Sequence, residues 1–347
     1  MSFRRVFALA SALVLAASFT LPAEAQDKPP APEQQQRKLS NDEKRDYIAL
    51  TELVDAVMAG KQPAPADLKL KFQNHFLKSN KNVYVPYLLD VSGGTFSSYP
   101  VTMYVRAVPK SAAGAAPAPA AKGAEANWPF ADVYFLTEKS MTTAGDVARL
   151  GRALELPPGE YTLYIAMRER QPKDRKQQPK TVVLAQPVTV PDLSTGLATS
   201  SIILAKSLDP APEQLTGQQQ LEQPFTISGY RIAPSFGEPI PMATGELMFV
   251  FFIYNEGIAA SGKPDIDVDY LFYRANEEKP FTKLATQSFN ATTLPGQFDL
   301  NAGHQVFVGQ GIPVKDAFTP GEYRLEIKVT DKTNGQAITR NLPFTVS

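Results

Sequence analysis

The chain has 347 residues, with 35 basic residues balanced by 35 acidic ones, two histidines and no cysteine. A formally neutral chain lacks the basic excess typical of nucleic-acid binding, so no nucleic-acid partner is expected. The lack of cysteine excludes disulfides, thiolate metal sites and a lipid anchor attached through cysteine.

Residues 1–25 have the pattern of a signal peptide. Arg4 and Arg5 precede an apolar run over residues 6–21, and Ala23-Glu24-Ala25 supplies the small residues of a cleavage site. The run is shorter than the about 20 apolar residues of a membrane span, so no transmembrane segment is expected in the mature chain. We expect cleavage after Ala25 and a periplasmic or secreted location in a bacterium, since an exported chain without cysteine is typical of bacteria. The general secretory and the twin-arginine routes both stay open.

A polar, proline-rich segment over residues 26–39 predicts a disordered tether. An amphipathic helix is expected next, over residues 40–60, because Ser40 and Glu43 form a capping box. Apolar residues then recur at helical spacing, at Tyr47, Leu50, Val54 and Met58. The helix either packs on the following domain or docks a partner, and the mixed charges of its outer face disfavour a membrane surface.

From residue 64 the pattern changes to short runs rich in Val, Tyr, Phe and Leu, which is typical of strands. Strands are expected at 69–77, 83–91, 101–108, 133–136, 150–156, 181–190 and 197–205. Half of residues 109–126 are alanine, interrupted by proline and glycine, which predicts a flexible insertion. A first domain is therefore expected at 64–206, followed by a linker at 207–223 that is rich in Pro, Gln and Glu.

A second domain is expected at 224–347, with strands at 225–232, 245–254, 265–270, 323–329 and 338–346. Residues 245–254 form the most hydrophobic stretch of the mature chain. Ten such residues are too few for a membrane helix and too continuous for a strand with one wet face, which indicates a strand buried on both sides. Phe249 and Phe251 on this strand are therefore candidate interface residues.

Two segments repeat one short pattern. Residues 156–165 read Leu-Pro-Pro-Gly-Glu-Tyr-Thr-Leu-Tyr-Ile, and residues 319–327 read Thr-Pro-Gly-Glu-Tyr-Arg-Leu-Glu-Ile. Pro-Gly predicts a turn, and the alternation that follows predicts a half-buried strand. Two copies of the pattern indicate two domains.

This pattern resembles the tyrosine corner of immunoglobulin-like sandwiches, with Leu163 and Leu325 standing where antibody domains have cysteine. The chain is thus similar to secreted bacterial immunoglobulin-like or fibronectin-type-III-like domains. The resemblance implies an all-β fold of two tandem antiparallel sandwiches, in which Tyr161 and Tyr323 have a structural role. A Pro-Gly turn in another kind of antiparallel sheet is the alternative.

Two further features are candidate interface residues. The hairpin tip over residues 168–180 has a local basic excess that could meet an anionic polymer, a lipid headgroup or an acidic partner, or could simply be a solvated loop. Its candidate residues are Arg168, Arg170, Lys173, Arg175 and Lys176. Trp128, the single tryptophan, is either a core residue or a ligand platform at a loop end.

The sequence shows no catalytic motif. Asp265, Asp267 and Asp269 share one face of a strand but lie about 6.5 to 7 Å apart, which is too far for one calcium ion. They are expected to face solvent, with Ile266, Val268 and Tyr270 inward. His75 and His304 are the only histidines, and each is expected to be a surface or hydrogen-bonded residue rather than a base. No catalytic residue, metal or cofactor is predicted.

These observations favour a noncatalytic binding or adaptor protein of the bacterial cell envelope. It would work through loop ends or a strand edge, with an envelope protein or an anionic or carbohydrate polymer as its partner. The alternative is a carbohydrate-binding protein or an accessory subunit of an envelope polysaccharide hydrolase, in which tyrosines and Trp128 stack on sugars. The chain is not expected to be an enzyme.

Overall fold

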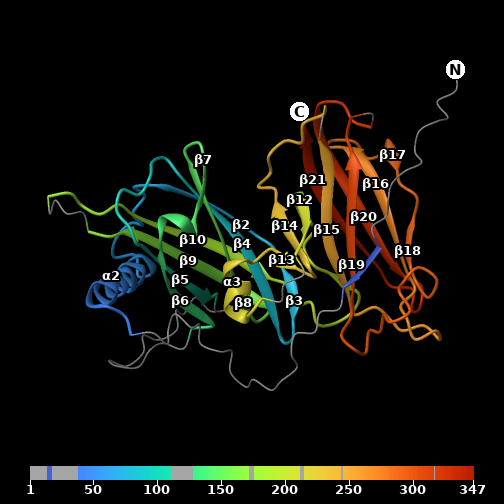
Figure 1. The fold of residues 1–347 in the computed structure, drawn as a ribbon, viewed down its shortest axis with the longest axis horizontal. Coiled ribbons are helices and arrows are strands. Elements are labelled where there is room, and N and C mark those ends of the chain that lie inside the picture. Colours follow the sequence, from blue (N-terminus) through green and yellow to red (C-terminus); the bar gives the residue numbers. More distant parts are fainter. Residues whose placement is uncertain are drawn as a thin grey trace. The chain divides into compact units, whose positions relative to one another are not determined.

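The computed structural model describes residues 14–17, 38–110, 128–171, 176–211, 215–243, 245–315 and 317–347 (Figure 1). These residues form four sheets whose strands pair antiparallel, which confirms the all-β prediction. The chain divides into an N-terminal unit of residues 25–192 and 215–224 and a C-terminal unit of residues 1–24, 193–214 and 225–347. Most of the predicted signal peptide, nearly all of the tether and the alanine-rich insertion lie outside the described residues.

The N-terminal unit contains two of these sheets. One has the strand order β10-β9-β5-β6, and the other has the order β2-β4-β8-β7 with β3 paired to β4. The first consists of β5 (Val101–Pro109), β6 (Phe130–Leu136), β9 (Gly159–Glu169) and β10 (Thr181–Val190). The second consists of β2 (Lys69–Asn74), β3 (Leu77–Ser79), β4 (Asn82–Ser92), β7 (Thr142–Ala144) and β8 (Val147–Leu156), and the turn η1 (Glu138–Ser140) precedes β7. Apolar side chains of both sheets are fully buried, for example Val105 and Leu154.

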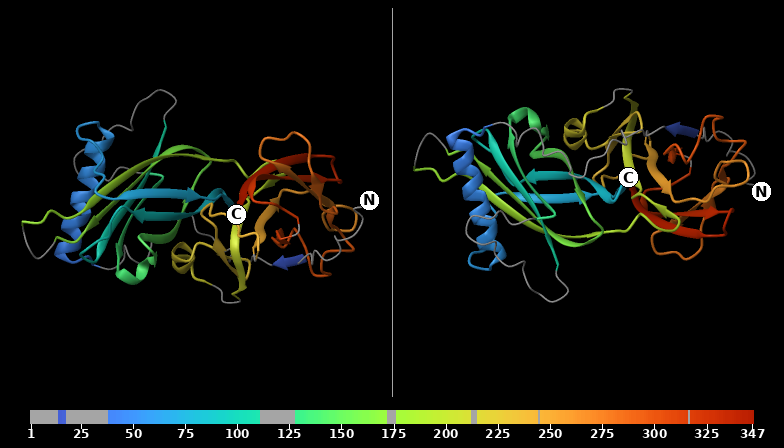
Figure 2. Two further views of the ribbon diagram at one scale, coloured as in Figure 1. Left: turned by 90° about the horizontal axis from the view of Figure 1, so that it is seen from above. Right: turned by 90° about the horizontal axis from the view of Figure 1, so that it is seen from below.

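Helix α2 (Asn41–Met58) lies on the outer side of the sheet that contains β5 and β9 (Figure 2). The predicted capping box is present: the amide of Ser40 donates to Glu43 Oε2 at 2.9 Å and the amide of Glu43 donates to Ser40 Oγ at 3.3 Å. Leu50 and Val54 are fully buried in a cluster that includes Tyr104 of β5. The helix therefore packs on its own unit. Among the described residues, no helix is long and apolar enough to cross a membrane.

The C-terminal unit is a second sandwich. One sheet has the order β1-β19-β15-β12-β14-β13 with β11 paired to β15, and the other has the order β17-β16-β20-β21 with β18 paired to β16. The first consists of β1 (Val14–Ala17), β11 (Ala198–Thr199), β12 (Ile203–Pro210), β13 (Thr226–Ile227), β14 (Tyr230–Pro234), β15 (Glu246–Tyr254) and β19 (Gln305–Pro313). The second consists of β16 (Ile266–Arg274), β17 (Thr282–Lys283), β18 (Gln287–Phe289), β20 (Gly321–Asp331) and β21 (Ala337–Val346). Aromatic residues of both sheets share one core cluster, including Phe249 and Tyr270.

The boundary between the two units differs from the predicted one. Residues 197–205 were expected to close the first domain, but Ile203 pairs with Val250 of β15 in the C-terminal unit. The expected linker over 207–223 contains the end of β12 and helix α3 (Gly217–Glu222), which contacts β8 of the N-terminal unit. The composition of an apolar strand does not show which sheet the strand joins. The sequence therefore predicted the end of the first domain at residue 206, whereas the N-terminal unit ends at residue 192 before the chain enters the C-terminal unit.

Both predicted corners make their backward hydrogen bond. The hydroxyl of Tyr161 donates to the carbonyl oxygen of Pro157 at 3.0 Å, and that of Tyr323 donates to the carbonyl oxygen of Thr319 at 2.7 Å. Gly321 has a φ of 155°, a conformation that side-chain-bearing residues rarely adopt, so the turn requires glycine. The corner therefore anchors the start of β20 in the C-terminal unit, as its counterpart anchors β9.

Candidate functional site

Trp128 lies beside a buried arginine. The guanidinium carbon of Arg106 is 4.8 Å from the centre of the Trp128 ring, and Arg106 is only 4% exposed. The same guanidinium pairs with the carboxylate of Asp55 on α2 and donates to the hydroxyl of Tyr104 at 2.8 Å. The indole ring is partly buried, and one of its faces is already covered by the guanidinium that pairs with α2.

The basic hairpin is only partly described. Lys173 and Arg175 lie outside the described residues, whereas Lys176 is exposed. Arg168 and Arg170 are near enough to α2 to act on its Asp46: burial raises the pKa of the Asp46 carboxyl, and the charges of both arginines oppose that rise. These two arginines thus lie on the side of the sheet that faces the helix, close enough for their charges to act on Asp46.

Phe249 and Phe251 do not lie on an interface. Their side chains are 0% and 1% exposed and belong to the core between the two sheets of the C-terminal unit. On the other face of β15, Val250 and Phe252 are also buried, as predicted for a strand covered on both sides. The interface hypothesis for the two phenylalanines is wrong, because alternation turns both of them toward the opposite sheet.

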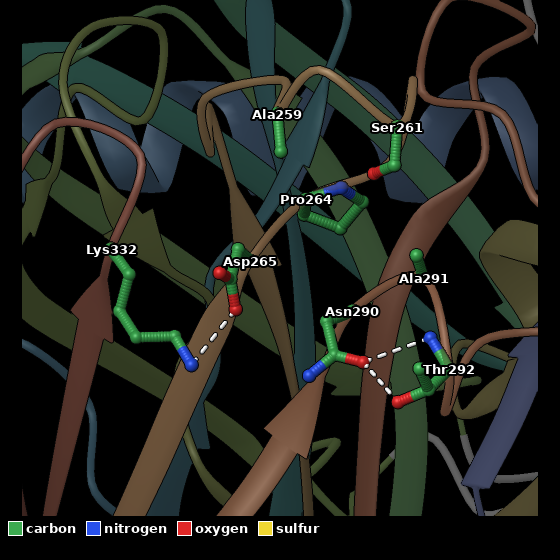
Figure 3. A pocket seen from close by; sticks show the side chains of 8 residues that line it. All are labelled: Ala259, Ser261, Pro264, Asp265, Asn290, Ala291, Thr292 and Lys332. Atoms are coloured by element: carbon green, nitrogen blue, oxygen red, sulfur yellow. Dashed lines mark hydrogen bonds and ion pairs between the residues drawn. The ribbon is translucent and has the colours of Figure 1, made fainter.

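One depression stands out in the C-terminal unit, at the end where β16 begins and β20 ends (Figure 3). It is open to solvent and has a volume of about 280 Å³. Its lining consists of Ala259, Ser261, Pro264, Asp265, Asn290, Ala291, Thr292 and Lys332. We call these eight residues and the loops that carry them the loop-end site. Its walls carry hydroxyl, amide, carboxylate and ammonium groups between small apolar ones.

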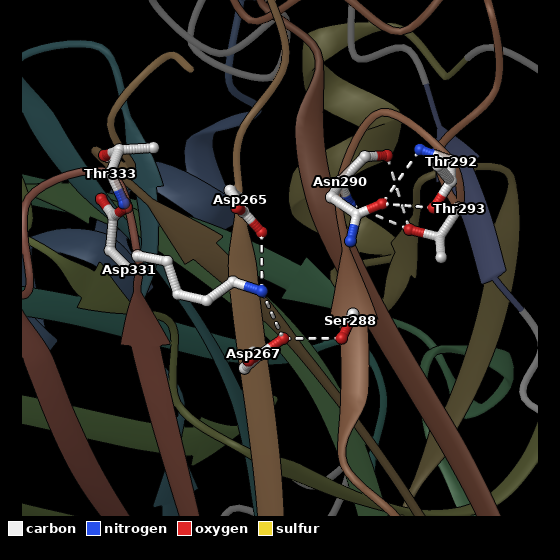
Figure 4. A network of polar contacts seen from close by, with 9 residues as sticks. Asp265, Asp267, Ser288, Asn290, Thr292, Thr293, Asp331 and Thr333 are labelled. Carbon is white, nitrogen blue, oxygen red and sulfur yellow. Dashed lines mark hydrogen bonds and ion pairs between the residues drawn. The ribbon is translucent and has the colours of Figure 1, made fainter. Parts of the chain in front are cut away.

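The charged side of the loop-end site is an ion-paired lysine (Figure 4). Lys332 Nζ lies 2.9 Å from Asp265 Oδ1 and 3.2 Å from Asp267 Oδ1. The Ser288 hydroxyl donates to the same Asp267 oxygen at 2.6 Å. Hydrogen bonding to Asp265 and then to Asp267 raises the pKa of Lys332 above its usual value. The ammonium group is therefore charged at neutral pH and is ion-paired with both carboxylates, although its side chain is 41% exposed.

The residue before this lysine, Asp331, has a buried carboxylate that holds the surrounding loops. Asp331 is 0% exposed, and its two oxygens accept from the amides of Gly257 (2.7 Å) and Thr333 (2.9 Å). They also accept from the Thr333 hydroxyl at 2.6 Å and from Asn334 Nδ2 at 2.9 Å. One carboxylate thus fixes both the loop after β15 and the turn between β20 and β21.

The opposite wall is equally constrained. Asn290 Oδ1 accepts from the amide of Thr292 at 2.9 Å and from its hydroxyl at 2.7 Å. This arrangement leaves the Asn290 amide nitrogen on the side of Asp265 and Lys332 (Figure 3). Lys263 Nζ donates to the carbonyl oxygens of Leu294 and Pro295 at 3.1 and 2.6 Å, so it ties the two loops together.

Asp265, just before β16, and Asp267 and Asp269 within it do not gather around one point. Ile266, Val268 and Tyr270 are 0%, 0% and 1% exposed, as predicted for the inward face. Asp265 and Asp267 pair with Lys332, while Asp269 accepts from the Thr286 hydroxyl at 2.6 Å. Within the described part of the chain, no group of three or more metal-ligating side chains is found.

The loop-end site was not predicted from the sequence, although one of its lining residues, Asp265, was considered there as a calcium ligand. The pairing of β16 with β20 brings Lys332 beside the start of β16, because Ile266 pairs with Asp331.

Comparisons with known proteins assign no family. No protein-family model and no curated protein matches the sequence. Among solved structures, native alpha-2-macroglobulin of E. coli is similar at 10% identity and a TM-score of 0.21, over 82% of this chain and 14% of that one. The fibronectin(III)-like modules of Clostridium thermocellum CbhA are similar at 9% identity and a TM-score of 0.18, over 80% of this chain and 94% of theirs. The all-β assignment rests on the sheets described above.

Proposed function

We propose that the chain is a noncatalytic binding or adaptor protein of the bacterial cell envelope, and that it binds through the loop-end site. The signal-peptide pattern of residues 1–25 supports export to the periplasm or the exterior. Ends of sandwich domains commonly present loops that bind partners on a rigid scaffold. The tyrosine corners at Tyr161 and Tyr323 support the finer proposal that both sandwiches are of the immunoglobulin or fibronectin-type-III kind.

The observation that carries this proposal is the preorganisation of the loop-end site. Lys332 is fixed by two carboxylates, and the loops around it are fixed by Asp331 and Lys263. A partner that binds here orders few side chains that were free before, and this lowers the entropic cost of association. Ile258, on the loop that ends in the site, is 47% exposed and adds an apolar contact at the rim.

The test is binding of the purified exported chain to three separated envelope fractions: outer-membrane proteins, peptidoglycan sacculi and lipopolysaccharide. We expect saturable binding to the protein fraction that the double variant Asp265→Ala, Lys332→Ala weakens by about tenfold, which corresponds to about 1.4 kcal/mol. The matched control is Lys206→Ala. It removes an exposed ion pair, with 2.8 Å between Lys206 Nζ and Glu238 Oε1, elsewhere in the same unit.

Two results count against the proposal. Equal binding by the double variant and the parent chain would remove the loop-end site from the interface. Hydrolytic turnover of sacculi by the purified chain would make it an enzyme rather than an adaptor.

Carbohydrate binding is the second candidate, and the lining of the loop-end site is what favours it. Ser261, Asn290 and Thr292 together with Asp265 present the hydroxyl, amide and carboxylate groups that bind sugar hydroxyls. The eight lining residues include no aromatic one, so stacking would have to come from elsewhere. Binding to sacculi that the Asp265→Ala, Lys332→Ala variant abolishes, with unchanged Trp128 fluorescence, would favour this candidate over a protein partner.

A further inference from the structure

The strand β19 lies between β15 and the short edge strand β1. On one side it pairs with β15 from Val306 through Pro313. On the other side, among the described residues, it pairs with β1 alone, in the antiparallel register Val14↔Val308 to Ala17↔Gln305. Four residues near the N-terminus of the chain thus complete the edge of a sheet in the C-terminal unit (Figure 1).

This occupant belongs to the segment that the sequence predicts is removed on export. Cleavage after Ala25 separates Val14–Ala17 from the rest of the chain. The amide and carbonyl groups that β19 directs toward β1 then lose their partners, and an unpaired edge is a template for another strand. Export would therefore open an acceptor edge on the folded protein.

The composition of β19 does not protect this edge. Its sequence, Gln-Val-Phe-Val-Gly-Gln-Gly-Ile-Pro, contains no charged residue, and its one proline is the last residue. Most edge strands of natural sheets are short or carry a charge or a proline that prevents further pairing. The other described edges of this chain follow that rule: β2 has Lys69 and Lys71, β6 has Asp132, β10 has Pro187, β21 has Arg340 and Pro343, and β7, β13 and β17 have two or three residues.

The first half of β19 is the part suited to accept a strand. With β1 in place, Val306, Phe307 and Val308 are 1%, 2% and 0% exposed, so alternate residues are packed on both faces of the sheet. At the other end, a Cβ at Gly311 would lie 2.5 Å from Glu246 Oε1, which places a carboxylate over that position. The uncharged half is the half that β1 occupies.

We propose that Gln305–Val308 of the exported chain is a strand-acceptor site for an extended, uncharged and apolar segment of a partner protein. The partner strand adds antiparallel to β19 in the place that Val14–Ala17 occupies here. Main-chain hydrogen bonds supply the affinity, and the packed faces on either side select apolar residues in the partner strand. This surface is separate from the loop-end site and goes beyond the proposed function.

The test is hydrogen exchange of the exported chain, which begins at Gln26, with and without a synthetic peptide of residues 10–19. In the free chain, the amides of residues 305–308 that point away from β15 exchange fast. With the peptide bound, we expect their exchange to slow by at least about tenfold. A peptide with Leu15→Pro, which lacks the amide opposite Phe307, and one with Leu15→Lys are the expected non-binders.

Variants of the chain provide the second measurement. Gln305 pairs with β1 but not with β15, so Gln305→Pro and Gln305→Lys change the acceptor edge without breaking the ladder that holds β19 in the sheet. We expect both to weaken peptide binding by about tenfold or more. Thr339→Lys on the exposed edge strand β21 is the matched control, and it leaves binding unchanged, as does Lys332→Ala in the loop-end site.

Three outcomes overturn the proposal. Amides of residues 305–308 that are already protected in the dilute free chain would mean that another segment of the chain itself covers the edge. Protection that appears only as the chain dimerises, measured by sedimentation, would assign the edge to a second copy. Peptide binding that leaves these amides unprotected, or that the Gln305 variants do not weaken, would place the acceptor elsewhere.

Discussion

The hydroxyl of Tyr323 makes three hydrogen bonds to Thr319, four residues upstream, one of them with the Thr319 hydroxyl at 3.1 Å. It donates to the carbonyl oxygen at 2.7 Å and lies 3.1 Å from the amide nitrogen. The ring is also stacked on Phe344 of β21, with 5.4 Å between ring centres, and is 2% exposed. The corner therefore joins the loop before β20 to the last strand of the unit.

Tyr323→Phe keeps the ring and removes this hydrogen-bonded hydroxyl. We expect the free energy of unfolding of the C-terminal unit to fall by about 1 to 2 kcal/mol, because the Thr319 amide and carbonyl are left in a partly buried turn. Urea unfolding followed by circular dichroism measures it. Tyr273→Phe is the control, since that hydroxyl makes one long bond of 3.3 Å to Glu326 and its loss should cost less than half as much. Equal costs would contradict a structural role for the corner.

Gly257 is the second place where a small change has a specific expected cost. A Cβ at this position would lie 2.0 Å from Thr333 Oγ1 and 3.1 Å from Thr333 Cβ. Gly257→Ala must therefore displace Thr333 and weaken the hydrogen bonds around Asp331, which costs about 2 kcal/mol. Gly296→Ala in the same unit is the control, because nothing lies within 4 Å of the added Cβ. Thermal unfolding of the two variants tests this, and equal melting temperatures would contradict it.

The predictions that succeeded rest on local chemistry. The capping box at Ser40 and Glu43 begins α2, and the alternation of β16 turns Ile266 and Val268 inward. Both corners follow from Pro-Gly and a tyrosine two residues later. In each case the residues that decide the structure lie within a few positions of one another, so their pattern is visible in the sequence.

The features that sequence reasoning missed depend on contacts between distant segments. The strand β19 was not predicted, because Gly309 and Gly311 interrupt its apolar alternation and only its ladder with β15 makes it a strand. Lys332 shows no partner in its own turn, since Asp265 reaches it through the pairing of β16 with β20. Phe251 looked like an interface residue because a sequence does not show which sheet covers a strand.

His75 gives the chain a pH dependence of stability. Burial lowers the pKa of its imidazole to about 4, from an ordinary value of 6.5. Between these two values the unfolded chain binds a proton here and the folded chain does not. The stability that the neutral His75 gives the folded chain is therefore fully present above pH 6.5. It is lost as the pH falls from 6.5 toward 4, by up to about 1.4 kcal/mol of unfolding free energy per pH unit.

The measurement is urea unfolding at pH 7 and pH 5 for the parent chain and for His75→Gln. We expect the parent to lose about 2 kcal/mol more than the variant over this interval, since the variant has no imidazole to titrate in the unfolded state. Carboxylates contribute equally to both chains and cancel in the difference. A variant that loses as much as the parent would show that His75 is not held neutral.

The last prediction concerns the attachment of α2. Arg106 is 4% exposed and pairs with Asp55 of the helix while its guanidinium covers the Trp128 ring. Arg106→Ala removes the ion pair, the cation–π contact and the buried stem, so the N-terminal unit should lose about 2 kcal/mol of unfolding free energy. Because Trp128 is the single tryptophan, its emission reports this contact directly and should shift to longer wavelength. Limited proteolysis should then cut within residues 41–63 faster than in the parent chain.

Arg45→Ala is the control: its pair with Asp42 is 65% and 57% exposed, and losing it should cost no more than about 0.5 kcal/mol. Unchanged emission and unchanged cleavage in Arg106→Ala would mean that the apolar contacts of Leu50 and Val54 hold the helix without the arginine.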